Sequence, residues 1–187
     1  MRFLALSGSL RTGSHSTELL RLAAAAARDD VDVVLYDGLK EIPPYDADDD
    51  LPGDQPAAVE RFKTALADAD AVLVATPEYN HSIPGALKNA LDWASRPILD
   101  SPVRNTPVAV LSSSTGMFGG VWAAAETRKV LGALGARVLE QTVTVPKAHE
   151  RLAGGGDDVL VAGLRAVLDA LAYEVALSAE PLLVRAV

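Results

Sequence analysis

Short, almost continuous apolar runs recur along the chain and predict five β-strands. All but the first are rich in valine and leucine. Such runs lack the alternation of a half-exposed strand and are typical of parallel strands that are covered on both faces. The predicted strands are residues 2–6, 31–36, 71–76, 108–111 and 137–145.

The segments between these runs carry apolar residues three or four positions apart, which is the spacing of an amphipathic helix. The predicted helices are residues 16–28, 57–67, 85–94, 121–134 and 159–177. In the last of them, a single apolar stripe extends from Leu160 to Val175. Asp157 and Asp158 follow three consecutive glycines, so we expect a hinge and a helix N-cap there.

The regular alternation of strand and helix predicts an α/β fold with a parallel sheet and right-handed crossovers. No linker, internal repeat or second hydrophobic block interrupts the pattern, so residues 1–187 are expected to form a single domain. In an open parallel sheet, ligands bind beyond the carboxyl ends of the strands. The loops that follow the first, third and fourth predicted strands are therefore the candidates for a functional site.

Composition narrows the possible classes of function. Hydrophobic residues make up 49% of the chain, which is enough for a folded core, and the formal net charge of -8 argues against nucleic acid or an anionic membrane as a partner. The chain has no cysteine, which excludes disulfides, thiol catalysis and cysteine-bound metals. The N-terminal apolar run is too short for a signal peptide, and no apolar stretch approaches the ~20 residues that span a bilayer. We therefore expect a soluble cytoplasmic protein.

Two segments outside the strand and helix pattern carry weaker signals. The loop at residues 37–56 contains the aspartates Asp46, Asp48, Asp49 and Asp50. It lacks the glycine, the glutamate and the spacing of an EF-hand loop, so a solvated acidic loop is predicted and a metal site is not. The C-terminal residues 181–187 are apolar and are expected to cover either a partner subunit or the chain's own surface.

The stretch GSLRTGSHST, residues 8–17, directly follows the first predicted strand. It lacks the three spaced glycines of the dinucleotide fingerprint and the Gly-Lys-Ser/Thr ending of a P-loop. Its backbone amides and hydroxyls, together with the forked guanidinium of Arg11, nevertheless suit a phosphate at a helix N-terminus. The alternative interpretation is an ordinary turn in which Ser14 or Ser16 caps the helix.

The loops after the third and fourth strands suit a flat heterocycle. In the first of these loops, Tyr79 offers a flat face and Asn80 offers donors and acceptors, although a turn with a core tyrosine is the alternative. We do not assign Glu78 as a general base, because exposed glutamates in turns are usually solvated. The loop SSSTGMFGG, residues 112–120, is flexible enough for close backbone approach. Together the three loops predict a mononucleotide with a large flat ring, held by its phosphate at the first loop.

GSLRTGS, TPEYNHSIPGALKNALDW and STGMFGG together resemble the NADPH-dependent FMN reductases, a group that includes related quinone, chromate and azo-dye reductases. The resemblance covers most of residues 1–145. It implies a flavodoxin-like, doubly wound fold with strand order 2-1-3-4-5, helices on both faces, and bound FMN. It also implies ping-pong transfer of a hydride from NADPH or NADH to flavin N5, and then of electrons to a quinone, flavin, chromate or azo acceptor. Because the cofactor supplies this chemistry, no catalytic residue and no metal is assigned.

The resemblance assigns the cofactor-binding residues by position. It places the FMN phosphate at Ser9, Arg11, Ser14 and Ser16, the last of which replaces an asparagine often found in the family. It places one side of the flavin ring at Pro77, Glu78, Tyr79 and Asn80, and the other side at Ser112, Ser113, Gly116 and Gly119.

The same resemblance implies a homodimer or homotetramer with the helix after PEYN near the interface. Leu87, Leu91 and Trp93 are then either interface residues or plain core residues, and His81 either lines the acceptor site or lies in a surface loop. Three other functions remain as alternatives: a flavodoxin-like electron carrier without nicotinamide activity, a non-redox FMN-binding domain, and a Rossmann dehydrogenase. The missing glycine fingerprint disfavours the last of these.

Overall fold

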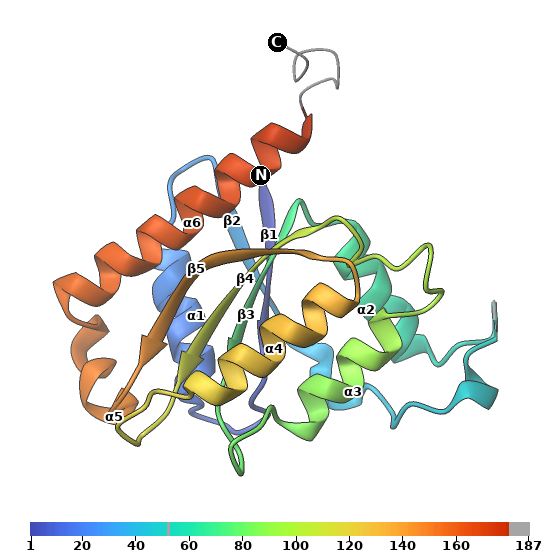
Figure 1. Cartoon of the computed structure of the whole chain (residues 1–187), viewed down its shortest axis with the longest axis horizontal. Helices are drawn as coiled ribbons and strands as arrows, with labels where there is room; N and C mark the ends of the chain where they lie inside the picture. The colour runs from blue at the N-terminus through green and yellow to red at the C-terminus, as the bar shows by residue number, and fades with distance from the viewer. Residues whose placement is uncertain (52, 180–187) are drawn as a thin grey trace.

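The centre of the structure is a five-stranded parallel sheet in the order β2-β1-β3-β4-β5 (Figure 1). This computed structural model describes residues 1–51 and 53–179, so the apolar tail at 181–187 lies outside the described residues. The strands are β1 (Arg2–Ser7), β2 (Asp32–Tyr36), β3 (Ala71–Thr76), β4 (Pro107–Ser113) and β5 (Arg137–Val145). The strand order and the flavodoxin-like α/β fold that we expected are therefore confirmed.

The longer helices alternate with these strands as predicted. They are α1 (His15–Ala26), α2 (Ala57–Ala67), α3 (Gly85–Ala94), α4 (Val121–Ala133) and α6 (Asp158–Ala179). The sequence pattern did not predict the short elements η1 (Gly38–Glu41), η2 (Ala47–Asp49), α5 (Ala148–Arg151) and η3 (Ala153–Gly155). Each of these has four residues or fewer, which is too short for a periodic apolar stripe.

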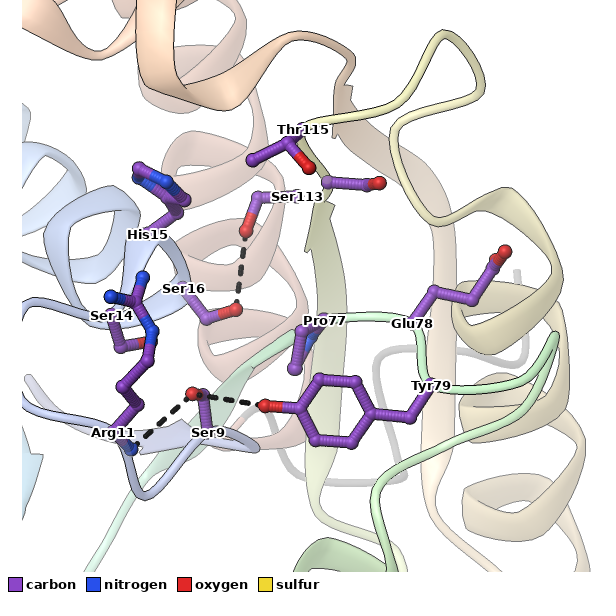
Figure 2. Close-up of a pocket in the computed structure, with 11 residues that line it drawn as sticks. Ser9, Arg11, Ser14, His15, Ser16, Pro77, Glu78, Tyr79, Ser113 and Thr115 are labelled. Carbon is purple, nitrogen blue, oxygen red and sulfur yellow. Dashed lines mark hydrogen bonds between the residues drawn. The ribbon is translucent and has the colours of Figure 1, made fainter.

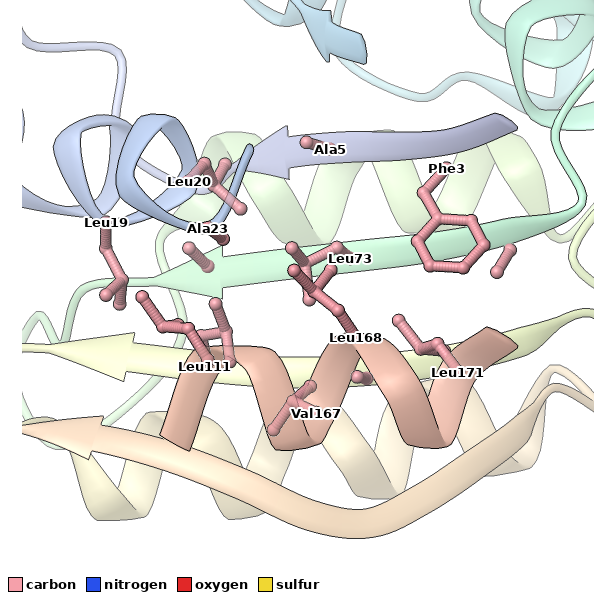
Figure 3. Packing of buried hydrophobic residues seen from close by; sticks show 14 of the residues in the cluster. Phe3, Ala5, Leu19, Leu20, Ala23, Leu73, Leu111, Val167, Leu168 and Leu171 are labelled. Atoms are coloured by element: carbon pink, nitrogen blue, oxygen red, sulfur yellow. The ribbon is translucent and has the colours of Figure 1, made fainter. Parts of the chain in front are cut away.

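Two hydrophobic clusters cover the two faces of the sheet. On one face, α1 and α6 pack Leu20, Leu168 and Leu171 against Phe3 and Leu73 (Figure 3). On the other face, α2, α3 and α4 pack against the remaining side chains of the same strands. β3 is buried along its whole length, which explains its unbroken apolar sequence. No helix among the described residues is long and apolar enough to span a membrane.

The side chains that we considered for a subunit interface belong to this chain's own core. Leu87, Leu91 and Trp93 on α3 are all buried among the second cluster. The indole N–H of Trp93 donates a hydrogen bond of 2.9 Å to the carbonyl oxygen of Pro43. Core packing is therefore the interpretation that the structure supports for these three residues.

Of the four aspartates in the acidic loop, only Asp50 is shielded from solvent. Asp46, Asp48 and Asp49 are exposed, and no group of three or more possible metal ligands occurs in residues 1–51 or 53–179. The Asp50 side chain is only 12% exposed and lies 3.6 Å from the ammonium of Lys63, which is 15% exposed. Burial lowers the pKa of Lys63, and the nearby carboxylate opposes that shift. The prediction of a solvated loop is thus wrong at this one position.

Asp157 is the N-cap of α6, as the sequence predicted. Its carboxylate accepts a hydrogen bond of 2.7 Å from the amide of Leu160 and further bonds from the guanidinium of Arg151. The bond from Leu160, followed by that from Arg151, lowers the pKa of Asp157. The charged carboxylate is therefore the form that the folded state favours.

We expect Asp157→Ala to lower the melting temperature at neutral pH by about 2–4 °C, the usual scale for a lost N-cap in a domain of this size. A depressed pKa contributes stability above the unfolded value, about 4, and loses it as the pH falls through the folded value. The melting temperatures of the wild-type protein and of Asp157→Ala should therefore converge in acid. Melting curves between pH 7 and pH 3 check this, with Asp158→Ala as the neighbouring control. A constant difference across that range would contradict the expectation.

Candidate functional site

The loops after β1 and β3 meet at the point where the strand order reverses. β1 lies between β2 and β3: the chain passes from β1 to β2 on one side and then crosses back to β3 on the other side of β1. The amide of Gly8 donates a hydrogen bond of 2.8 Å to the carbonyl oxygen of Ala75, which joins the first loop to the end of β3. A Cβ atom on Gly8 would lie 3.0 Å from Leu87 and 3.2 Å from Pro77, so glycine permits this close approach.

A cleft of about 170 Å³ opens at this reversal point, and we call it the rim cleft (Figure 2). Three segments that are far apart in the sequence contribute to its walls. The lining residues are Ser9, Arg11, Ser14, His15, Ser16, Pro77, Glu78, Tyr79, Ser113, Ser114 and Thr115. The topology alone thus brings together the three loops that the sequence singled out.

The hydroxyls of the first loop take part in a connected set of contacts. Ser14 is the N-cap of α1, and its oxygen accepts a hydrogen bond of 3.3 Å from the amide of Thr17. The buried hydroxyls of Ser16 and Ser113 lie 3.1 Å apart, and those of Ser9 and Tyr79 lie 3.5 Å apart (Figure 2). Ser14 therefore caps the helix, as the alternative interpretation held, and it also lines the rim cleft.

Arg11 supplies the positive charge of the rim cleft. Its side chain lines the cleft and runs beside Ser14 toward His15 (Figure 2). Within the described parts of the chain, its guanidinium forms no ion pair with a carboxylate, whereas most other arginines do. The first amides of a helix lack carbonyl partners within it, and in α1 the Ser14 hydroxyl caps that of Thr17. The combined donors create a positive environment suited to an anion.

The second loop contains a tight turn between Tyr79 and Ser82. Tyr79 and Ser82 exchange two backbone hydrogen bonds, of 3.0 and 3.1 Å. The two residues between them, Asn80 and His81, have φ values of 53° and 61°. Both are in the left-handed region, where asparagine is the most tolerant residue after glycine. Asn80 forms the turn and does not line the rim cleft.

Glu78 is not a solvated glutamate, contrary to our expectation. Its side chain is 13% exposed, and one carboxylate oxygen accepts hydrogen bonds from the amides of Trp122 (3.1 Å) and Ala123 (3.2 Å). These amides belong to the first turn of α4, whose N-cap, Gly120, has no side chain to cap it. Figure 2 shows the carboxylate turned away from the serine cluster. Glu78 therefore ties the second loop to α4.

β4 continues two residues beyond its predicted end, and this moves the third loop. Ser112 and Ser113 pair with Thr144 and Val145 of β5, so both are strand residues. Because successive side chains in a strand point to opposite faces, only Ser113 reaches the rim cleft. The Ser112 hydroxyl is fully buried beside the position of Gly120 and has no hydrogen-bond partner among the described residues.

The two glycines that we assigned to the third loop do not line the rim cleft either. The carbonyl oxygen of Gly116 accepts a hydrogen bond of 3.0 Å from the amide of Lys147, in the segment after β5. Gly119 has a φ of 62°, and a Cβ atom there would lie 2.6 Å from Thr144 and 2.7 Å from the nitrogen of Pro146. Both glycines anchor the third loop to the end of β5.

Eight of the twelve predicted site residues line the rim cleft, and four do not: Asn80, Ser112, Gly116 and Gly119. The structure adds His15, Ser114 and Thr115. Ser114 and Thr115 belong to the same hydroxyl-rich run as the predicted Ser112 and Ser113. His15 lies in the first turn of α1, and nothing in its sequence context distinguished it.

Known proteins resemble this chain over most of its length. The sequence profile described as NADPH-dependent FMN reductase matches residues 1–150. A quinone reductase of Escherichia coli K12 is 38% identical over 141 residues, which cover 75% of this chain and 74% of that protein. An NAD(P)H-dependent FMN reductase of Pseudomonas aeruginosa is 43% identical over 131 residues, which cover 70% of this chain and 69% of that protein.

A solved structure agrees over nearly the whole chain. It is the flavoenzyme NAD(P)H:(acceptor) oxidoreductase FerB from Paracoccus denitrificans, with a TM-score of 0.84 and 30% sequence identity. The alignment covers 94% of this chain and 97% of that one. The similarity therefore extends beyond the matched profile and includes α6.

Proposed function

Because the chain belongs to the NADPH-dependent FMN reductase family, we propose that it binds FMN in the rim cleft and uses it to oxidise NADPH or NADH. When bound, FMN supplies the redox chemistry by accepting a hydride from the reduced nicotinamide and passing the electrons to a small-molecule acceptor. The protein's own contribution is to bind and orient the cofactor through the residues that line the cleft.

The donor set of the rim cleft carries the proposal. The first loop offers the Arg11 guanidinium, three serine hydroxyls and the first amides of α1, while the Glu78 carboxylate is turned toward α4. This is a site for a dianionic phosphate in a chain whose net charge is -8. The departure at Ser16 is compatible with this site, because Ser16 still lines the cleft and its hydroxyl lies 3.1 Å from that of Ser113.

The other two loops suit the ring of the cofactor. Pro77 and Tyr79 form one wall of the cleft, and Ser113 and Thr115 form the opposite wall (Figure 2). A cleft with one flat aromatic wall and a facing wall of small polar groups suits a planar heterocycle with polar edges. We assign the FMN ring to the space between these walls.

The visible spectrum of the purified protein tests the proposal most directly. We expect flavin absorption bands, release of FMN on denaturation, and oxidation of NADPH or NADH in the presence of menadione. A protein that binds FMN but leaves both nicotinamides unoxidised would instead be an electron carrier. A colourless protein that takes up no FMN on titration would reject the proposal altogether.

Arg11→Ala should weaken FMN binding by about 1–3 kcal/mol, the scale of a hydrogen bond to a charged group, which corresponds to roughly a 5- to 150-fold higher Kd. Titration of the FMN-free variant with FMN measures this. Arg21→Ala is the matched control, because Arg21 lies on α1 but pairs with Glu18 and does not line the cleft. Equal Kd values for the two variants would remove Arg11 from the phosphate site.

A further inference from the structure

An exposed group of aromatic side chains lies beside the rim cleft, and we call it the aromatic cluster. It consists of His81, Phe118 and Trp122. The ring centroids of Phe118 and Trp122 are 5.1 Å apart with a 63° angle between the planes, and those of His81 and Trp122 are 5.0 Å apart at 86°. These are favourable edge-to-face arrangements.

The aromatic cluster is unusually open to solvent. Phe118 is 62% exposed, Trp122 is 44% exposed and the side chain of His81 is 78% exposed. Large apolar side chains that remain exposed together indicate a binding surface more often than isolated ones do. By contrast, the other tryptophan, Trp93, is fully buried.

The cluster is held in place by the wall of the rim cleft. Glu78 lines that cleft, accepts the hydrogen bond from the Trp122 amide, and has its other carboxylate oxygen 3.5 Å from Nδ1 of His81. The tight turn between Tyr79 and Ser82 fixes the backbone that carries His81. One residue thus connects the proposed cofactor site with the aromatic cluster, and the two are continuous.

The charges attached to the cluster are negative. Besides Glu78, the side chain of Glu126 on α4 accepts a hydrogen bond of 2.6 Å from the Ser82 hydroxyl, at the end of the same turn. Aromatic edges and faces bind planar rings, whereas neighbouring carboxylates and a net charge of -8 oppose anions. The chemistry favours an uncharged planar ring over an oxyanion or a sulfonated dye.

We propose that His81, Phe118 and Trp122 form the binding surface for the electron acceptor and select uncharged planar quinones over anionic acceptors. The inference rests on the proposed function, because it assumes that an acceptor approaches the rim cleft. It adds to that function the residues that determine acceptor specificity and the charge that these residues disfavour.

Trp122 serves as its own reporter in the first test, because Trp93 is buried and the exposed tryptophan dominates quenching by solutes. The holoenzyme is titrated with 1,4-naphthoquinone and with 1,4-naphthoquinone-2-sulfonate, which share a ring and differ in charge. We expect saturable quenching by the neutral quinone at a concentration about five- to tenfold below that needed for the sulfonate. The difference should shrink as salt is added.

Kinetics supply the second test. Trp122→Ala and Phe118→Ala should each raise KM for 1,4-naphthoquinone by about five- to tenfold. Glu126→Gln should instead lower KM for the sulfonate by about two- to fivefold. Tyr173→Ala is the control, because Tyr173 is an aromatic residue on α6 that is 64% exposed and outside the cluster.

The outcomes separate the inference from the proposed function. Bound FMN and its bleaching by NADPH without an added acceptor test the function alone. If both are present but the two quinones quench Trp122 equally, or the Trp122 and Tyr173 variants have the same KM, the inference is overturned. A concentration-dependent blue shift of the Trp122 emission without quinone quenching would show that a second copy of the chain covers the cluster, and it would overturn the inference as well.

Discussion

Gly119→Ala is expected to destabilise the protein by about 2–5 kcal/mol. About 1–2 kcal/mol comes from placing an L-residue at a φ of 62°. A further 1–3 kcal/mol or so comes from overpacking, because the new Cβ would lie 2.6 Å from Thr144, 2.7 Å from Pro146 and 2.9 Å from Val145. Two of these three contacts are with backbone atoms, which cannot rotate away. In a domain of this size, the melting temperature should fall by about 5–15 °C.

The effect should also reach the rim cleft, because the third loop must move away from the end of β5. Ser114 and Thr115 line the cleft, and the amide of Ala148 donates a hydrogen bond of 2.9 Å to the carbonyl oxygen of Ser114. Displacing this loop should weaken FMN binding beyond what lost stability explains. Titration with FMN at a temperature where the variant remains folded measures this second effect.

Two other glycines make a matched series for this prediction. Gly13 has a φ of +70° but nothing within 4 Å of a Cβ, so alanine there should cost only the conformational part, about 1–2 kcal/mol. Gly132 lies in α4 with open space around it, and alanine there should stabilise the helix by about 0.5–1 kcal/mol. Equal destabilisation at positions 119 and 13 would show that contact with β5 contributes nothing.

Most of the fold could be predicted because its signals are local. An apolar run or an apolar stripe is a property of neighbouring residues, and the bounds of β3, β5, α2 and α3 follow from it without error. The predicted end of β4 came two residues too early because Ser112 and Ser113 are polar, although both are buried in the strand. Apolar periodicity cannot show that a serine lies inside a sheet when its strand partner is more than 30 residues away.

The site was predicted in outline and missed in detail for the same physical reason. That three loops share one edge follows from topology, so most of the predicted residues do line the rim cleft. The surroundings of each side chain depend on what packs against it. Glu78 has a sequence context typical of a solvated turn, yet its partners lie 44 and 45 residues further along the chain. The aromatic cluster likewise joins residues from two loops and from the first turn of α4.

Glu78→Ala should destabilise the protein by about 2–3 kcal/mol. The change removes a nearly buried carboxylate that accepts two amide hydrogen bonds at the start of α4, and those amides then lose their partner. The N-cap residue Gly120 has no side chain that can replace it. Thermal melting measures the loss. Glu60→Ala is the matched control, because Glu60 is an exposed glutamate in the first turn of α2, where the change should stay within about 0.5 kcal/mol.

The variant Glu78→Gln distinguishes a structural role of Glu78, as a cap of α4, from a role in proton transfer. The amide oxygen of glutamine can still accept hydrogen bonds from α4, so we expect Gln to recover at least half of the stability and most of the FMN affinity that Ala loses. If Glu78 instead acted as a general base, Gln would keep the melting temperature but reduce turnover by about 10²-fold or more. Because the carboxylate is turned toward helix amides and away from the serine cluster, turnover should follow stability and FMN affinity across the Glu, Gln and Ala series.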